Sequence, residues 1–88
     1  MRLRLAPEWE CWPLWDDETG DNLDPSDLDL PPALLARLLA WDDVFQAAFN
    51  RDDPLASVLP GEDWREEGRA LAAEFEALGF KVVVHLYD

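Results

Sequence analysis

The chain has 88 residues, enough for one small domain and too few for a second of ordinary size. Twenty acidic residues against seven basic ones give a net charge of −13, and 49% of the residues are hydrophobic. Such a negative field repels nucleic acid and anionic lipid, while this apolar content is too high for a disordered chain. We therefore expect a single acidic domain over residues 1–88 that makes no direct contact with nucleic acid or membrane.

The N-terminus and the single cysteine, Cys11, bear on the compartment. One cysteine excludes an internal disulfide, so the chain is not a disulfide-stapled secreted scaffold. Residues 1–8 lack the apolar region of a signal peptide, and no run approaches the ~20 apolar residues of a membrane span. We expect a cytoplasmic protein.

The first elements along the chain are short and extended. Arg2–Leu5 alternates polar and apolar residues, which predicts a short edge strand. Residues 9–15 are interrupted by Pro13, which cannot donate to a ladder, so they are expected to form an edge strand or an extended loop. Residues 16–22 are polar and contain Gly20, so a β-hairpin turn is plausible there.

The middle of the chain predicts helices. Asp24 and Pro25 are typical of a helix start, although the prolines that follow leave room for a single turn only. A long helix is expected from Pro32 to Phe49, ended by residues 50–54. Its apolar seam consists of Leu34, Leu38, Trp41, Phe45 and Ala48, and the residues expected largely on the other side are Arg37, Asp42, Asp43 and Gln46.

A second long helix is expected from Glu62 to Leu78, with Gly79 as its C-terminal cap. Gly68 falls in its apolar seam, which indicates close approach by a neighbouring element. The last segment, Phe80 to Tyr87, alternates clearly as a strand, and its second face is half apolar, so it is expected to be internal to the sheet or partly covered. Arg2–Leu5 is its expected neighbour.

These elements predict an α+β fold: a small two-layer sandwich in which two long helices pack on a small β-sheet that includes the N- and C-terminal strands. The strand order between Pro7 and Leu23 is left open. The chain is expected to be a monomer or a weak homodimer.

No convincing enzyme active site is present in the sequence. The single histidine, His85, and Cys11 are the residues from which a nucleophile and its base could be built, and both are explained more simply as ordinary packed residues. Zinc spacing is absent, and aligning Gly20 with the sixth position of an EF-hand puts Ser26 at the twelfth, so that pattern fails. We expect no enzymatic activity and no cofactor, with weak calcium binding by the acidic loop left open.

The feature that points to a function is a cluster of tryptophans among acids. No Lys or Arg occurs between Leu5 and Ala36. If residues 9–15 are extended, Trp9 and Trp15 share one face and Trp12 the other, so at least one ring is expected to be exposed. Aromatic anchors within a charged rim are typical of protein interfaces. The candidate partner-binding residues are Trp9, Trp12, Trp15, Asp16, Asp17, Glu18, Asp21 and Asp24.

Small acidic uncharacterised bacterial proteins are similar to this chain at residues 21–30, at Leu34, Leu38, Trp41, Phe45 and Asn50, and at Glu67-Gly68-Arg69. In size and charge the chain also resembles toxin-immunity proteins and barstar-like inhibitors. That second resemblance implies an acidic face that caps a basic toxin nuclease, and barnase–barstar is a standard example of charge-steered association.

We therefore interpret the chain as a protein-binding inhibitor, an immunity protein that occludes the active site of a basic toxin, and we expect this toxin to be a nuclease. One alternative is a DNA mimic directed at a nucleic-acid-binding protein, of the anti-restriction or anti-CRISPR type, with rows of acids along the helices. The other is a non-catalytic structural or regulatory subunit whose charge serves solubility alone.

Overall fold

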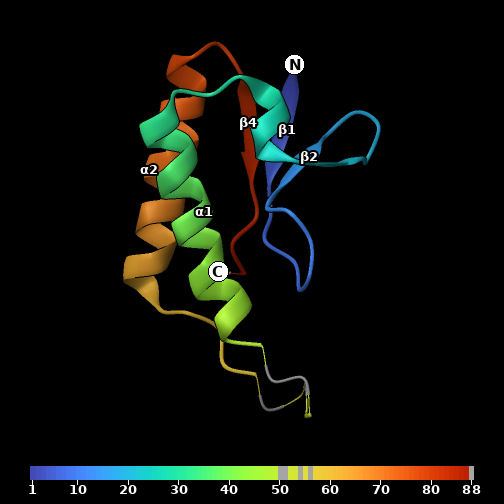
Figure 1. Ribbon diagram of the computed structural model, residues 1–88, viewed down its shortest axis with the longest axis vertical. Coiled ribbons are helices and arrows are strands. Elements are labelled where there is room, and N and C mark those ends of the chain that lie inside the picture. Colours follow the sequence, from blue (N-terminus) through green and yellow to red (C-terminus); the bar gives the residue numbers. More distant parts are fainter. Residues whose placement is uncertain (50–51, 54, 56, 88) are drawn as a thin grey trace.

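The structure, a computed structural model, describes residues 1–49, 52–53, 55 and 57–87. Figure 1 shows two long helices, α1 (Pro32–Ala47) and α2 (Glu62–Ala77), lying side by side against a small sheet. The first and last strands, β1 (Arg2–Leu5) and β4 (Lys81–Val84), are both in that sheet. The predicted two-layer α+β sandwich is therefore confirmed.

The sheet has the order β3-β2-β1-β4, with β2 spanning Leu14–Asp16 and β3 spanning Asn22–Leu23. β1 pairs antiparallel with β2 and parallel with β4, in the register that places Arg4 between Trp15 and Val83. The prediction that β1 is an edge strand was wrong, because β1 lies inside the sheet. The last strand was expected to be internal or partly covered: β4 lies at the edge of the sheet, and Val83 on its second face is 39% exposed. The half-apolar outer face of β4 remains partly exposed.

The hairpin expected from the turn residues is present as β2 and β3, which pair antiparallel. Pro13 does not lie within a ladder, because β2 begins at the next residue, and its carbonyl accepts from the Ala6 amide at 3.0 Å. The strand that follows Pro13 is therefore an inner strand, not the expected edge strand. A single 3₁₀ turn, η1 (Pro25–Leu28), follows with Asp24 as its N-cap, as predicted.

Both long helices begin where the sequence predicts and end one or two residues early. α1 starts at Pro32, and α2 starts at Glu62 with two acids in its first turn, which suits the helix dipole. Gly79 adopts a φ of 101° just after the end of α2, so it provides the left-handed cap. Residues 50, 51 and 54, which were expected to help end α1, lie outside the described residues.

Leu3 and Leu5 of β1, Leu38 and Phe45 of α1, and Phe75 of α2 are all at most 1% exposed and form the centre of the core. The strand expected over Phe80–Tyr87 is shorter, but the backbone beyond it stays close to β1, since the His85 amide donates to the Leu5 carbonyl.

The close approach expected at Gly68 is confirmed. A Cβ atom at this position would lie 2.7 Å from Cζ2 of Trp41 and 3.1 Å from Cδ1 of Leu86. Real Cβ atoms do not tolerate the first of these contacts, so the glycine lets α1 and the C-terminal segment pack against α2.

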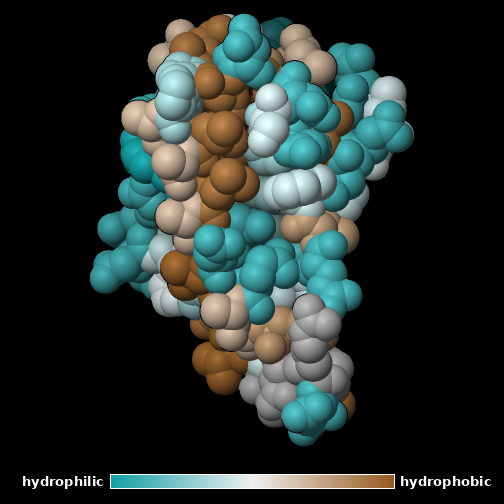
Figure 2. Space-filling view, viewed as in Figure 1, coloured by the Kyte–Doolittle hydropathy of each residue, from teal (hydrophilic) through white to brown (hydrophobic). Residues whose placement is uncertain are grey.

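The outer side of the helical layer is partly apolar. Figure 2 shows a band of hydrophobic residues over α1, bordered by hydrophilic residues. On this helix Leu35 and Leu39 are half-buried and Val44 is exposed, so the sheet and α2 do not cover it completely.

Candidate functional site

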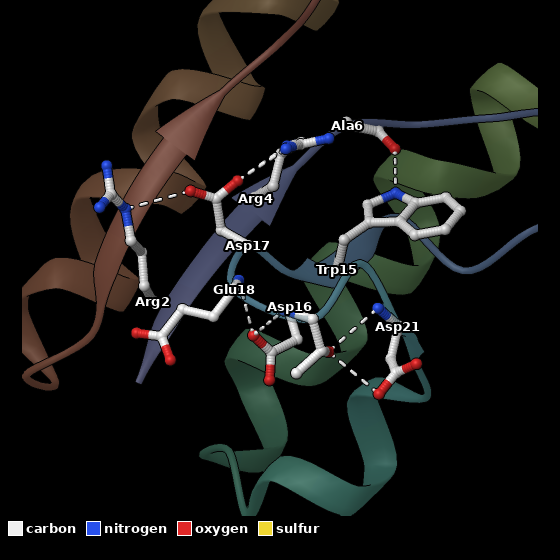
Figure 3. Close-up of polar contacts among 9 residues, drawn as sticks. Arg2, Arg4, Ala6, Trp15, Asp16, Asp17, Glu18 and Asp21 are labelled. Atoms are coloured by element: carbon white, nitrogen blue, oxygen red, sulfur yellow. Dashed lines mark hydrogen bonds and ion pairs between the residues drawn. The ribbon is translucent and has the colours of Figure 1, made fainter.

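The acidic turn between β2 and β3 is held in shape by its own side chains (Figure 3). Oδ1 of Asp16 accepts from the amides of Glu18 at 2.9 Å and Thr19 at 3.3 Å, and Oγ1 of Thr19 donates to Oδ2 of Asp21 at 3.0 Å. The Asp16 amide donates in turn to the Asp21 carbonyl. These contacts give the turn a defined shape and leave Glu18 and Asp21 exposed.

Asp17 has a different role, because it faces the basic side chains of β1. Its carboxylate lies 3.1 Å from Nε of Arg2 and 2.8 Å from Nη2 of Arg4, and the side chain is only 13% exposed (Figure 3). Two cations at this distance largely neutralise the carboxylate, so Asp17 ties the hairpin to the sheet. Asp24 is also engaged locally, since Oδ1 accepts from the Ser26 amide at 2.9 Å.

The three tryptophans separate into three environments. Trp12 is 43% exposed, whereas Trp9 stacks on Phe45 with ring centroids 3.9 Å apart. Trp15 lies on the sheet face opposite the helices, because its neighbour Leu14 points into the core, and its Nε1 donates to the Ala6 carbonyl at 2.8 Å (Figure 3).

The prediction that at least one ring is exposed is therefore confirmed. The expectation that Trp9 and Trp15 share a face was wrong. Glu10 adopts a φ of 63°, so the backbone turns between the two rings and residues 9–15 are not one extended segment.

Two polar residues of α1 belong to the same region and were placed on the wrong side of the helix by the sequence analysis. Gln46 bridges α1 to the loop before β2: Oε1 accepts from the Glu10 amide, and Nε2 donates to the Glu8 carbonyl, both at 2.8 Å. Asp42 is only 7% exposed, and burial raises the pKa of its carboxyl to about 6. The helical spacing indicates that Asp42 faces inward, because it follows Leu38 by four residues and precedes Phe45 by three.

Together these residues line a pocket of about 410 Å³ beside the exposed tryptophan. Asn22 of β3 holds the backbone of Trp12 on both sides, accepting from its amide at 3.0 Å and donating to its carbonyl at 2.8 Å. The full lining is Glu10, Cys11, Trp12, Asn22, Asp42 and Gln46. The pocket thus joins the loop before β2, the hairpin and α1.

Three acids of the helical layer, Glu62, Glu67 and Glu74, are paired with arginines. Arg37 contacts both Glu67 and Glu74, and Glu62 contacts Arg65 and Arg69 at 2.8 and 2.9 Å. The hydrogen bonds from Arg69 and Arg65 lower the pKa of Glu62. A row of unpaired acids, which a DNA mimic would need, is interrupted here because Glu62 and Glu67 carry local counter-ions.

Cys11 and His85 lie in different environments. Cys11 lines the pocket, and His85 makes an edge contact with the Tyr87 ring at 5.6 Å between centroids. Across the described part of the chain no group of three or more His, Cys, Asp and Glu side chains is arranged to hold a metal ion. In the same residues no helix has both the length and the apolar character to cross a membrane.

Comparison with known proteins identifies the class. The model of one protein family, described as Serratia CdiI immunity protein-like, matches the chain over residues 1–88. The protein is therefore of the immunity class, whose members have a cognate toxin as their partner. The chain belongs to the Serratia CdiI immunity protein-like family, and its resemblance to toxin-immunity proteins is confirmed. A search of curated proteins finds no match.

Proposed function

We propose that this immunity protein acts in the cytoplasm on a basic toxin, and that the toxin is a nuclease whose active site the acidic hairpin occludes. The observation that carries the proposal is the run from Leu5 to Ala36, which has no Lys or Arg and contains both the exposed acidic turn between β2 and β3 and the exposed Trp12. A nuclease binds phosphates with cationic groups, and carboxylates can occupy those positions.

The proposed partner-binding residues divide by role. Glu18 and Asp21 are exposed acids, and Trp12 is the exposed aromatic anchor. The remaining members shape or anchor this surface through the contacts described above: Trp9, Trp15, Asp16, Asp17 and Asp24. An acidic rim speeds encounter with a basic partner, and a buried aromatic anchor slows dissociation.

The test uses two double variants with the same change of charge. Glu18→Lys with Asp21→Lys alters the hairpin, while Glu66→Lys with Glu76→Lys alters exposed positions on α2. The partner is the toxin recovered from its complex with this protein by denaturation and refolding, and binding is followed by surface plasmon resonance. At low salt we expect the hairpin variant to lose about 10-fold or more in association rate constant, and the α2 variant to change by less than about threefold.

Salt provides a second readout, because screening removes steering. At high salt the wild type and the hairpin variant should converge in association rate. Equal losses in the two double variants would show that net charge alone matters, and the hairpin would then not be the binding surface.

The nuclease part of the proposal is tested with the toxin itself. The free toxin should cleave RNA or DNA, and one equivalent of the wild-type protein should abolish cleavage. Oligonucleotide should compete with this protein for the toxin. A toxin that cleaves no nucleic acid, or one that still cleaves in the complex, would contradict active-site occlusion.

A further inference from the structure

The pocket beside Trp12 has a buried carboxylate in its lining. Asp42 lines the pocket from α1 while its side chain is only 7% exposed. The carboxylate therefore borders a space that a ligand group could enter, although it is largely withdrawn from water.

Among the described residues the Asp42 carboxylate has little compensation. Nε2 of Gln46 lies 3.4 Å from Oδ1 of Asp42, a long contact, and the same nitrogen serves the carbonyls of Glu8 and Cys11. No ion pair joins Asp42 to a Lys or Arg of residues 1–49, 52–53, 55 or 57–87. Burying a charged group without a counter-ion is unfavourable, so a cation that entered the pocket would relieve a cost already present in the free protein.

The wall of the pocket also suits a cation. Trp12 is exposed, and an indole face attracts ammonium and guanidinium groups. Asn22 fixes the Trp12 backbone through two hydrogen bonds, so the segment that carries this ring is held at the pocket.

We propose that this pocket receives an arginine or lysine side chain of the toxin, with Asp42 as its counter-ion and Trp12 as its aromatic wall. The inference rests on the proposed function in taking the toxin to be basic. It adds a specific binding site for one cationic side chain to the electrostatic attraction that the acidic hairpin provides. The binding partner of the pocket is a single side chain, so the contact contributes to the lifetime of the complex.

The first experiment tests the pocket in the free protein. The probe is N-acetyl-arginine amide, and its uncharged isostere N-acetyl-citrulline amide is the control. Both are titrated while the indole N–H of Trp12 and the side-chain amide of Gln46 are followed by NMR. We expect saturable shifts with the arginine probe in the wild type and in Asp43→Asn, and their loss in Asp42→Asn. Asp43→Asn is the matched control because it removes the same charge from the adjacent, exposed position.

The inference is overturned if the arginine probe gives no saturable shift. It is also overturned if the citrulline probe gives the same shift, or if Asp42→Asn leaves the shift intact.

The second experiment measures toxin binding by the same variants. Asp42→Asn should weaken the complex by about 30-fold or more, mainly through faster dissociation, whereas Asp43→Asn should remain within about threefold of the wild type. Unfolding curves of Asp42→Asn that show a folded protein at the assay pH exclude loss of structure as the cause.

The two proposals fail separately. If the hairpin variant loses association rate but Asp42→Asn binds as the wild type does, the acidic-hairpin mechanism stands and the pocket inference is wrong. If Asp42→Asn loses affinity and the hairpin variant does not, the pocket stands and the hairpin mechanism is wrong.

Discussion

At the scale of single residues, Asp42 is an acidic residue that is almost fully buried, which is unusual in a small domain. The helical period places it on the inward side of α1, between the positions of Leu38 and Phe45, and yet it is an acid. Burial, the largest cause, raises the pKa of its carboxyl from 3.8 to about 6, and the nearby Asp43 acts in the same direction. The fold therefore favours the protonated form.

The pH dependence of stability follows from that sign. The pKa of the Asp42 carboxyl is higher in the folded state than in the unfolded state. The contribution of this group to the free energy of unfolding is therefore complete below pH 3.8 and is lost as the pH rises through about 6. At pH 7.5 we expect Asp42→Asn to be more stable than the wild type by about 1–3 kcal/mol, since one pKa unit corresponds to ~1.4 kcal/mol. The two proteins should approach each other in stability at pH 4. Urea unfolding at four pH values between these limits measures the difference.

Asp43→Asn is the control here as well, because it removes the same charge from the adjacent, exposed position. An Asp42→Asn variant that is less stable than the wild type at pH 7.5 would show that the carboxylate is compensated inside the protein. The argument for an incoming cation would then lose its basis.

At the scale of elements, the two long helices are joined by a reciprocal pair of indoles. Nε1 of Trp41 donates to the Trp64 carbonyl at 2.8 Å, and Nε1 of Trp64 donates to the Trp41 carbonyl at 3.0 Å. The rings stack with centroids 4.6 Å apart and planes 4° from parallel. Stacking and hydrogen bonding together fix how α1 lies on α2 at this crossing.

Replacing one donor tests that link. Trp41→Phe removes the hydrogen bond to the Trp64 carbonyl and leaves a smaller ring, so we expect a loss of about 1–2 kcal/mol in the free energy of unfolding. Near-ultraviolet circular dichroism should weaken at the same time. Trp12→Phe, at an exposed ring, should change stability by less than about 0.5 kcal/mol. Equal effects at the two positions would contradict the structural role of the pair.

The elements were predicted well where their signals are local. The apolar spacing, Pro32 and Gly79 define the helices to within two residues, and alternation defines β1 to the residue. Which strand lies at the edge of the sheet depends on pairing between distant segments. The last segment alternates more clearly than Arg2–Leu5. Alternation predicts which face of a strand is exposed, but it does not predict whether the strand pairs with one neighbouring strand or two.

The candidate site was predicted only in part, because some of its contacts join segments that are distant in the sequence. The exposed tryptophan and the acidic turn were found from composition, but the hydrogen bonds that occupy Asp16 and Asp17 depend on the folded hairpin. The positive φ of Glu10, which separates Trp9 from Trp15, has no strong signal in a non-glycine residue. The burial of Asp42 was not predicted, because polar residues are usually exposed, although its position in the helical period faces inward.

At the scale of the whole molecule, a net charge of −13 acts against the compact state. Ion pairs such as those of Arg37 with Glu67 and Glu74 offset part of this repulsion, but they use all five described arginines. Salt therefore has two opposing effects on this protein: it screens self-repulsion, and it screens attraction to a basic partner.

We expect added NaCl, from about 0.02 to 0.3 M, to raise the Tm of the free protein, because the Debye length falls to ~8–10 Å at 0.1–0.15 M and further at the upper concentration, which screens most surface charge pairs. Association with the toxin should slow over the same range. Sucrose at matched osmolality is the control for effects that do not depend on charge. A Tm that falls with NaCl would mean that the local ion pairs outweigh the repulsion.

The parallel pairing of β1 with β4 has a consequence for how the protein comes into being. Arg2 pairs with Lys81 and Leu5 with Val84, so the sheet is closed by residues from nearly opposite ends of the chain. During translation the first strand emerges early and must wait for the last, because contacts of such long range form only when both segments are available. A chain that stops before Lys81 lacks the second neighbour of β1. Protection of the cell by this protein is therefore expected to require β4, and copies that stop before Lys81 should give none.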